Sequence, residues 1–241
     1  MSASDDNEGT LRAAWQENAA DWVRWGASPG LDHAFWRMNL PWLLDLIPPP
    51  GRLTVDVGCG EGRVARVLRE RGHRVIGIES SLALAAAARE ADPGFEVHVA
   101  DAARMPLADR AADIVVASMV FQSLDHPAAV MREIARVLAP GGRLCASFVH
   151  PLNSLGGLRT DASYFEVKRY ADTMERDGAT MTFHDVHRPF GDYARLFEES
   201  GLLIEAMREP VPDDDYVASH PQVEDWRRRP LFLQVRALRP F

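Results

Sequence analysis

Residues 55–63 read Val-Asp-Val-Gly-Cys-Gly-Glu-Gly-Arg, and this stretch decides the fold. The apolar run at residues 53–57 predicts a short buried strand, which the glycines at positions 58, 60 and 62 end. Residues 61–71 then carry apolar side chains at helical spacing. A strand that turns through glycines into a helix presents free backbone N–H groups, which attract a polar or anionic ligand. Such a turn can also be a plain tight connection, so its context decides between the two interpretations.

Strands and helices alternate along the next hundred residues. Further apolar runs predict strands at residues 74–78, 95–100, 112–119 and 143–149, with helices over 80–91 and 124–138 between them. After residue 151 the pattern is looser and predicts a helix at 192–200 and strands at 202–207 and 231–238. Alternating strands and helices form βαβ units, in which the sheet is parallel and helices cover both faces. The sequence therefore predicts an α/β protein with a doubly wound, seven-stranded Rossmann-like sheet.

The remaining sequence divides into a tail, a cap and two insertions. Residues 1–9 are polar and acidic and predict a disordered tail. Residues 10–50 hold five of the six tryptophans and predict an N-terminal helical cap, which Thr10 begins as an N-cap and three prolines end. The main domain is predicted over residues 51–241, with an irregular insertion at 152–186 and a polar insertion at 213–229.

Composition and charge exclude several classes of protein. Hydrophobic residues make up 46% of the chain and charged residues 26%, the balance of a globular protein. No apolar run approaches the ~20 residues of a membrane helix, and the polar N-terminus is not a signal peptide, so we expect a cytoplasmic protein without a membrane partner. The net charge of −8 lies outside residues 51–151, which are neutral. Because nucleic-acid-binding proteins usually carry a basic footprint, we expect no nucleic-acid partner.

Three acidic residues are associated with the ends of three predicted strands. Glu79 closes the second strand, where a carboxylate can accept both hydroxyls of a ribose. Asp101 closes the third strand, and with the backbone N–H of Ala102 it can read the edge of an adenine. Asp56 lies just before the glycines, where it suits a ligand with a cationic amino group. Helix capping would explain Glu79 and Asp101 separately, but the three acids together fit adenosine joined to an amino acid.

The motifs, taken in order, are similar to those of a known family. They are VDVGCGEG at 55–62, GIESS at 77–81, VADA at 99–102 and the stretch from residue 113 to 144. The sequence resembles the class I S-adenosyl-L-methionine-dependent methyltransferases, in the small-molecule branch that includes ubiquinone- and menaquinone-pathway enzymes. The resemblance is clear over residues 52–151, weaker over 187–240 and faint before residue 48. It implies S-adenosyl-L-methionine as cofactor, S-adenosyl-L-homocysteine as product, and a last strand that runs antiparallel.

The resemblance also implies which residues hold the cofactor. In chain order they are Asp56, Gly58, Cys59, Gly60, Glu79, Ser80, Asp101, Ala102, Ser118 and Met119. The first four and the last two lie beside the methionine part, Glu79 holds the ribose hydroxyls, and the others border the adenine. Gln122 occupies a position where relatives often carry a histidine.

Histidines and aromatic residues are the candidates for the acceptor side. A hydroxyl acceptor needs a base, and His150, directly after the fifth strand, is the predicted one. The predicted substrate pocket consists of Trp25, His33, Phe35, Trp36 and Gln122, because aromatic faces suit an apolar acceptor and a sulfonium. Trp15, Trp22 and Trp42 are expected to pack the cap helices. His184 and His187 have the spacing of a metal pair but lack further ligands, so no metal is predicted.

These features predict a methyltransferase of secondary metabolism that acts on an O, N or C atom of a small, partly apolar metabolite, as a monomer or homodimer. A cofactor-binding protein that does not methylate, such as a cyclase on the same fold, is the alternative. An NAD-dependent oxidoreductase is less favoured, because the glycines are spaced Gly-x-Gly-x-Gly and Asp56 precedes them. The neutral centre and acidic flanks also disfavour a nucleic-acid methyltransferase.

Overall fold

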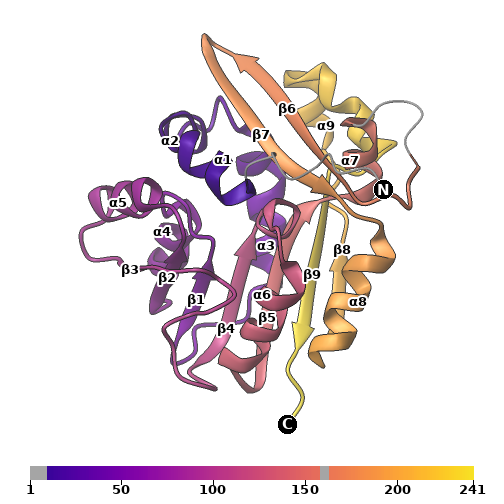
Figure 1. Cartoon of the computed structure of the whole chain (residues 1–241). Helices are drawn as coiled ribbons and strands as arrows, with labels where there is room; N and C mark the ends of the chain where they lie inside the picture. The colour runs from indigo at the N-terminus through magenta and orange to yellow at the C-terminus, as the bar shows by residue number, and fades with distance from the viewer. Residues whose placement is uncertain (1–9, 158–162) are drawn as a thin grey trace, which may run out of the picture.

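The computed structural model describes residues 10–157 and 163–241 (Figure 1). Within them, seven strands form one sheet in the order β3-β2-β1-β4-β5-β9-β8. The strands are β1 (Thr54–Val57), β2 (Val75–Glu79), β3 (Glu96–Val99), β4 (Ala112–Ser118), β5 (Leu138–Val149), β8 (Leu203–Arg208) and β9 (Phe232–Leu238). The predicted seven-stranded sheet is confirmed, and the strand limits agree to within one residue except at β5, which begins at Leu138 instead of residue 143.

The strand directions identify the edge of the sheet at which a ligand is expected to bind. β1 pairs in parallel with β2 and β4, and β3 and β5 continue the parallel arrangement. β9 pairs antiparallel with both β5 and β8, so the expected antiparallel last strand is confirmed. Because β1 to β5 are parallel, their carboxyl ends share one edge, and open α/β sheets bind ligands there.

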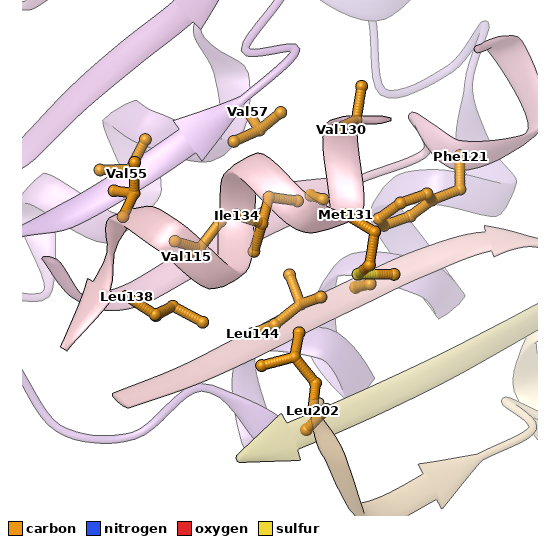
Figure 2. Close-up of a cluster of buried hydrophobic side chains, with 14 of the residues drawn as sticks. Val55, Val57, Val115, Phe121, Val130, Met131, Ile134, Leu138, Leu144 and Leu202 are labelled. Atoms are coloured by element: carbon orange, nitrogen blue, oxygen red, sulfur yellow. The ribbon is translucent and has the colours of Figure 1, made fainter. Parts of the chain in front are cut away.

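Helices α6 (Pro127–Val137) and α8 (Phe190–Ser200) cover one face of the sheet. On α6, Ile134 follows Val130 by four residues and Met131 by three, so the three side chains share one side of the helix. They pack against strand residues in a fully buried cluster (Figure 2).

The other face is covered by α3 (Leu40–Leu46), α4 (Arg63–Glu70) and α5 (Leu82–Ala91). Their apolar sides form a second core, in which Leu43 and Leu68 are fully buried. Two cores on opposite faces make the sheet doubly wound, as the alternating sequence pattern predicts.

The N-terminal cap is helical. Thr10 begins α1 (Leu11–Glu17), because its Oγ1 accepts a hydrogen bond from Ala13 N at 3.2 Å. α2 (Ala19–Gly26) follows at once, and a π-helical turn, η1 (Phe35–Asn39), leads into α3. These elements lie beside the carboxyl edge of the sheet (Figure 1).

The segment at 152–186, predicted to be irregular, instead contains a β-hairpin after the short helices α7 (Pro151–Ser154) and η3 (Leu155–Gly157). Its strands are β6 (Lys168–Arg176) and β7 (Ala179–His187), which form a separate two-stranded sheet. The two residues between them, Asp177 and Gly178, have φ of +48° and +70°, as a tight hairpin turn requires. Asp-Gly is a hairpin signal, so this part of the prediction was wrong although the sequence carried the information.

The polar insertion at 213–229 is folded into two short helices, α9 (Asp214–Ser219) and the 3₁₀ helix η4 (Pro221–Arg227). Asp213 caps α9 by accepting a hydrogen bond from Tyr216 N at 2.7 Å. Residues 1–9, predicted to be a disordered tail, lie outside the described residues. No helix in the described ranges has both the length and the apolar character to cross a membrane.

Gly77, in the middle of β2, leaves no room for a side chain. A Cβ there would lie 2.7 Å from Cys59 Sγ and 2.7 Å from Phe95 Cζ. We expect Gly77→Ala to lower the free energy of unfolding in urea by about 1–3 kcal/mol, because overpacking displaces its neighbours. Gly191→Ala is the matched control, since nothing lies within 4 Å of its Cβ position. Equal losses in the two variants would contradict this account of the β2 packing.

Candidate active site

A cavity of about 710 Å³ lies at the carboxyl edge of the sheet. The ends of β1, β2 and β4 line it, together with the cap helices and the β6–β7 hairpin, which crosses above this edge (Figure 1). All ten residues predicted to hold the cofactor line this one cavity. The structure therefore brings together residues that lie up to 63 positions apart in the sequence.

The glycine loop has a backbone that only glycine adopts easily. Gly58, Gly60 and Gly62 have φ of +64°, +56° and +85°. A Cβ on Gly58 would also lie 2.7 Å from a methyl carbon of Val120. The backbone N–H groups of Gly58 and Cys59 both donate to the Ile78 carbonyl, at 2.8 and 3.2 Å, and so tie the loop to β2.

Glu79 lies at the end of β2, and its carboxylate is buried against backbone donors. Oε2 accepts from Gly60 N at 2.9 Å and Oε1 accepts from Ser81 N at 2.8 Å. Burial raises the pKa of Glu79, while these two amides act in the opposite direction. Each carboxylate oxygen can accept a second hydrogen bond, so Glu79 retains the capacity to bind a diol from the cavity.

Asp56 is the most perturbed acid of the cavity. It is fully buried in β1, and Oδ2 has no hydrogen-bond partner among the residues that the structure describes. Burial, together with the charges of Glu79 and Glu61, raises the pKa of Asp56 to about 8. A cationic donor placed beside it would stabilise the ionised carboxylate.

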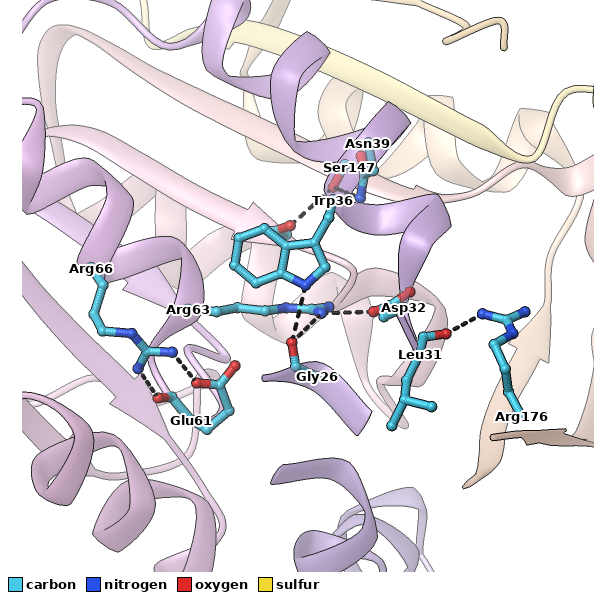
Figure 3. Close-up of polar contacts among 11 residues, drawn as sticks. Gly26, Leu31, Asp32, Trp36, Asn39, Glu61, Arg63, Arg66, Ser147 and Arg176 are labelled. Carbon is cyan, nitrogen blue, oxygen red and sulfur yellow. Dashed lines mark hydrogen bonds and ion pairs between the residues drawn. The ribbon is translucent and has the colours of Figure 1, made fainter. Parts of the chain in front are cut away.

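Glu61, which we did not predict, adds a third carboxylate to this region. It lies inside the glycine motif and is buried, with Oε2 at 2.5 Å from Arg66 Nη2 (Figure 3). Its Oε1 has no partner in the described part of the chain. Its place between two loop glycines was the signal for its role, because the loop backbone turns toward the ligand edge.

The predicted adenine end is more open. Asp101 follows β3 and is exposed, and its Oδ1 accepts from Ala103 N at 2.8 Å. Its Oδ2 lies 4.0 Å from Arg12 Nη1 of the cap. Ser80 and Ala102 are half-buried beside it and line the same cavity.

The end of β4 presents Ser118 and Met119 to the cavity. Ser118 Oγ lies 3.2 Å from Ser147 Oγ on β5, and Met119 N donates to the Ser147 carbonyl at 2.7 Å. Gln122 follows in a 3₁₀ turn, η2 (Phe121–Ser123), and its Nε2 donates to the Met119 carbonyl at 2.8 Å. Its Oε1 is buried and has no partner among the described residues.

Aromatic side chains of the cap form one wall, and an arginine lies against it. Trp25 and Phe35 line the cavity as predicted, and Trp22 joins them. The Arg63 guanidinium carbon lies 3.4 Å from the centre of the Phe35 ring and 4.7 Å from that of Trp22. Asp32 holds this guanidinium at 2.7 Å (Figure 3). Trp15 also lines the cavity, so Trp15 and Trp22 do more than pack the cap helices.

Two predicted pocket residues do not line the cavity. Trp36 packs edge-on against Phe35, with ring centroids 5.6 Å apart, and lies outside the cavity lining. Its Nε1 donates to the Gly26 carbonyl at 3.2 Å (Figure 3). His33 is buried behind the wall, where Nδ1 makes a short hydrogen bond to the Tyr216 hydroxyl. Burial, followed by the charge of Arg176, lowers the pKa of His33 to about 4.

His150, the predicted base, is a structural residue in this fold and does not line the cavity. It caps α7: Nδ1 accepts from Leu152 N at 3.1 Å, and Nε2 lies 3.0 Å from Glu209 Oε1. Both ring nitrogens are therefore engaged away from the site. Position alone, one residue after β5, suggested catalysis, whereas the following Pro151 fixes a helix start that uses the imidazole as its cap.

His184 and His187 lie three residues apart on β7, so their side chains point to opposite faces of the hairpin. His187 is fully buried, with Nδ1 at 2.7 Å from Ser154 Oγ and Nε2 at 2.9 Å from the Tyr164 carbonyl. Among the described residues, no group of three or more His, Cys, Asp or Glu side chains is arranged to hold a metal ion.

One whole wall of the cavity was missing from the prediction, because it belongs to the hairpin. Its cavity-lining residues are Tyr170, Asp172, Met174, Arg176, Phe183 and Asp185. They alternate along β6 and along β7 and therefore share one face of the two-stranded sheet. The alternation was present in the sequence, but it points to a site only when the hairpin is known to cover the sheet edge.

The part of the chain that forms this site matches a known protein family. Residues 55–146 match the family model described as "Methyltransferase domain". The chain carries a class I S-adenosyl-L-methionine-dependent methyltransferase domain. That domain spans β1 to β5 and contains all ten of the predicted cofactor residues.

The relatives of this methyltransferase domain agree in fold and differ in activity. A ubiquinone/menaquinone biosynthesis C-methyltransferase of Caulobacter vibrioides is 30% identical over 149 residues, which are 56% of this chain and 58% of that protein. An S-adenosylmethionine-dependent methyltransferase structure from Mesorhizobium loti has a TM-score of 0.66 at 25% identity and covers 86% of this chain and 98% of its own. A [4+2]-cyclase has the same fold, with a TM-score of 0.68 at 18% identity over 96% of this chain and 97% of its own. The chain spans less than half the length of several other curated relatives.

The donor set of the methyltransferase domain fits its cofactor class. S-adenosyl-L-methionine carries a cationic amino group, a sulfonium and a ribose diol. Asp56 Oδ2, buried without a partner, calls for a cationic donor, Glu61 Oε1 is a second buried oxygen that lacks a donor, and Glu79 can accept from a diol. Gly58 and Gly60 line the cavity, where a Cβ on either would press against Val120 at 2.7 Å or Trp22 at 3.2 Å, so the loop can take this path beside a ligand only with glycine.

Asp56 makes the stability of the cofactor-free protein depend on pH. Its pKa is about 8 in the folded chain, against an ordinary value of 3.8, so the folded state retains a proton that the unfolded state loses. Stability therefore falls as the pH rises from about 4 to about 8. Asp56→Asn removes this loss. We subtract the melting temperature of the unmodified protein from that of the variant, and we expect this difference to be about 2–4 °C larger at pH 8.5 than at pH 5.

Thermal unfolding followed by fluorescence measures this difference. Asp225→Asn is the control, because its side chain is 69% exposed. An Asp56→Asn difference that is the same at both pH values would show that the folded carboxyl is not protonated near neutral pH.

Proposed function

We propose that this chain is an S-adenosyl-L-methionine-dependent methyltransferase that methylates an O, N or C atom of a small, partly apolar acceptor. The observation that carries the proposal is the grouping of Asp56, Glu79 and Asp101, from three adjacent parallel strands, along one cavity. Each acid matches a different part of the cofactor, and they lie in the order that an extended ligand across the sheet edge requires.

Each of the cavity's cofactor residues binds a different part of the cofactor. Asp56 and the glycine loop receive the amino-acid part, Glu79 the ribose, and Asp101 with the Ala102 N–H the adenine. When bound, the cofactor supplies an electrophilic methyl group on a sulfonium. The chain then has to hold an acceptor atom in line with that methyl group and to exclude water, which supplies most of the acceleration of a displacement.

The acceptor side of the cavity supports a small and partly apolar molecule. Phe183 of β7 and Trp226, Leu231 and Phe232 near β9 give it apolar walls, beside polar groups of the hairpin. The whole cavity, cofactor end included, has a volume of about 710 Å³, which is in the range of pockets that bury small-molecule ligands. We propose that the chain acts as a monomer or homodimer on such a metabolite, with no nucleic-acid or membrane partner.

A cyclase-like protein that binds the cofactor without methyl transfer is the second candidate, favoured by the fold shared with a [4+2]-cyclase. Radiolabelled cofactor and a panel of metabolites distinguish the two. Transfer of label to any acceptor supports the methyltransferase, whereas cofactor binding without transfer to the panel supports the cyclase-like protein.

Glu79→Gln tests the cofactor site directly. The substitution removes the charge and replaces one acceptor oxygen with a donor that faces Gly60 N–H or Ser81 N–H. We expect binding of S-adenosyl-L-homocysteine, measured by titration calorimetry, to weaken at least tenfold, which is about 1.4 kcal/mol. Asp101→Ala should also weaken it. The control Glu90→Gln, exposed on α5, should bind normally. Normal binding by both site variants would mean that the cofactor lies elsewhere.

A further inference from the structure

The cavity contains more carboxylates than the cofactor uses. Several of its acids are neutralised by arginines at short distances: Asp32 by Arg63 at 2.7 Å, Glu61 by Arg66 at 2.5 Å and Asp125 by Arg169 at 2.7 Å. Asp56 and Glu79 serve the cofactor end. Asp172 and Asp185, on the hairpin, line the cavity and form no ion pair with the arginines and lysines that the structure describes. These two acids therefore remain for a different ligand.

Asp185 is a buried acid with a side-chain hydrogen bond, and not a solvated surface residue. Its side chain is only 5% exposed, and Oδ1 accepts a hydrogen bond from Ser123 Oγ at 2.5 Å. No described residue donates to Oδ2. On the paired strand, Tyr170 lies directly across from Asp185, and Asp172 is the diagonal neighbour on the same face. One face of the hairpin thus presents two carboxylates and the Tyr170 side chain to the cavity.

Gln122, the residue before Ser123, gives independent evidence that this cavity lacks a hydrogen-bond donor. Its turn, η2, packs against β7, and the next residue, Ser123, is the one that holds Asp185. The Gln122 side chain is 4% exposed and lines the cavity, and its Oε1 has no partner among the described residues. An unpaired buried carbonyl is costly, so a ligand N–H is the natural partner. Through Nε2, the same side chain contacts the Met119 carbonyl at the cofactor end.

Other charges near Asp185 leave room for one more cation. Arg188 is buried close by, but its guanidinium donates to the carbonyls of Phe121 and Leu124, at 3.2 and 2.6 Å. Arg176, farther along the hairpin, donates to the Leu31 carbonyl and lies over the Trp25 ring at 5.4 Å. With Asp172 counted, the acids around Asp185 outnumber Arg188, and the surplus is one negative charge.

We infer that Asp185, Asp172 and Gln122 form a binding site for an ammonium group, and that the methyl acceptor is a primary or secondary amine. This inference rests on the proposed methyltransferase function and narrows its O, N or C acceptor to nitrogen. Carboxylates and a carbonyl accept the N–H bonds of the amine, and the apolar walls receive its body.

The site also accounts for the proton that the reaction must remove. The bound ammonium gives one proton to the ionised Asp185 carboxylate, which leaves a neutral amine and a neutral acid. The nitrogen lone pair then forms the N–C bond to the methyl carbon, the S–C bond breaks, and its electron pair stays on sulfur. The positive charge passes from sulfur to nitrogen. Burial raises the pKa of Asp185 to about 6, which suits a group that is ionised near pH 7 and accepts a proton readily.

The test compares amines with neutral molecules of the same shape. With the protein saturated by S-adenosyl-L-homocysteine, tryptamine, phenethylamine and octylamine are titrated by calorimetry beside tryptophol, 2-phenylethanol and octanol. We expect at least one amine to bind tenfold or more tightly than its alcohol. Asp185→Asn should remove that preference, and the exposed Asp172→Asn, which carries less risk to folding, should reduce it. Asp215→Asn, exposed on α9, is the matched control.

The outcomes separate the two proposals. If S-adenosyl-L-homocysteine itself does not bind, the proposed function fails. A different outcome is that S-adenosyl-L-homocysteine binds equally well to the unmodified protein and to Asp185→Asn. In that case the amine inference alone is overturned if no amine binds below 1 mM, or if amines bind no better than alcohols. Transfer of radiolabel to the alcohols and not to the amines would also overturn it.

Discussion

The carboxylate of Glu79 joins the end of β2 to the glycine loop, and the geometry of the cavity depends on that connection. One oxygen accepts from Gly60 N at 2.9 Å and the other from Ser81 N at 2.8 Å. The first bond holds a loop whose positive φ angles favour glycine, and the second holds the turn that begins α5. A buried carboxylate is stable only when it is hydrogen-bonded, so the same contacts that form the ligand edge also make Glu79 tolerable to the fold.

Cation binding in this cavity depends on carboxylates more than on aromatic faces. The aromatic wall looks suited to a sulfonium or an amine, but Arg63 already lies against Phe35 at 3.4 Å, and Arg176 lies over Trp25 at 5.4 Å. The unpaired acids lie at two other places, at Asp56 beside the glycine loop and at Asp185 on the hairpin. Since a cation gains most where a desolvated charge has no partner, we expect positive charge to be held at these two places.

The cofactor half of the site could be predicted from sequence, because each of its residues closes a local element. Asp56, Glu79 and Asp101 follow from short apolar runs, and parallel pairing then brings the runs to one edge. The acceptor half could not be predicted in this way. Trp36 and His150 lie at plausible positions, but a helical turn directs the first away from the cavity and a helix cap engages the second. Their neighbours in space come from segments far along the chain, which no local pattern places.

The hairpin shows how a distant turn fixes the chemistry of the acceptor site. Tyr170, Asp172 and Asp185 face the cavity because the register pairs Tyr170 with Asp185 and Asp172 with Phe183. That register follows from the two-residue turn at Asp177 and Gly178, whose positive φ angles match the twist of the strands. A slip of one residue would turn every side chain of a strand to the opposite face and replace the carboxylates with outward-facing residues such as Arg169. The turn therefore determines which side chains of the hairpin line the cavity.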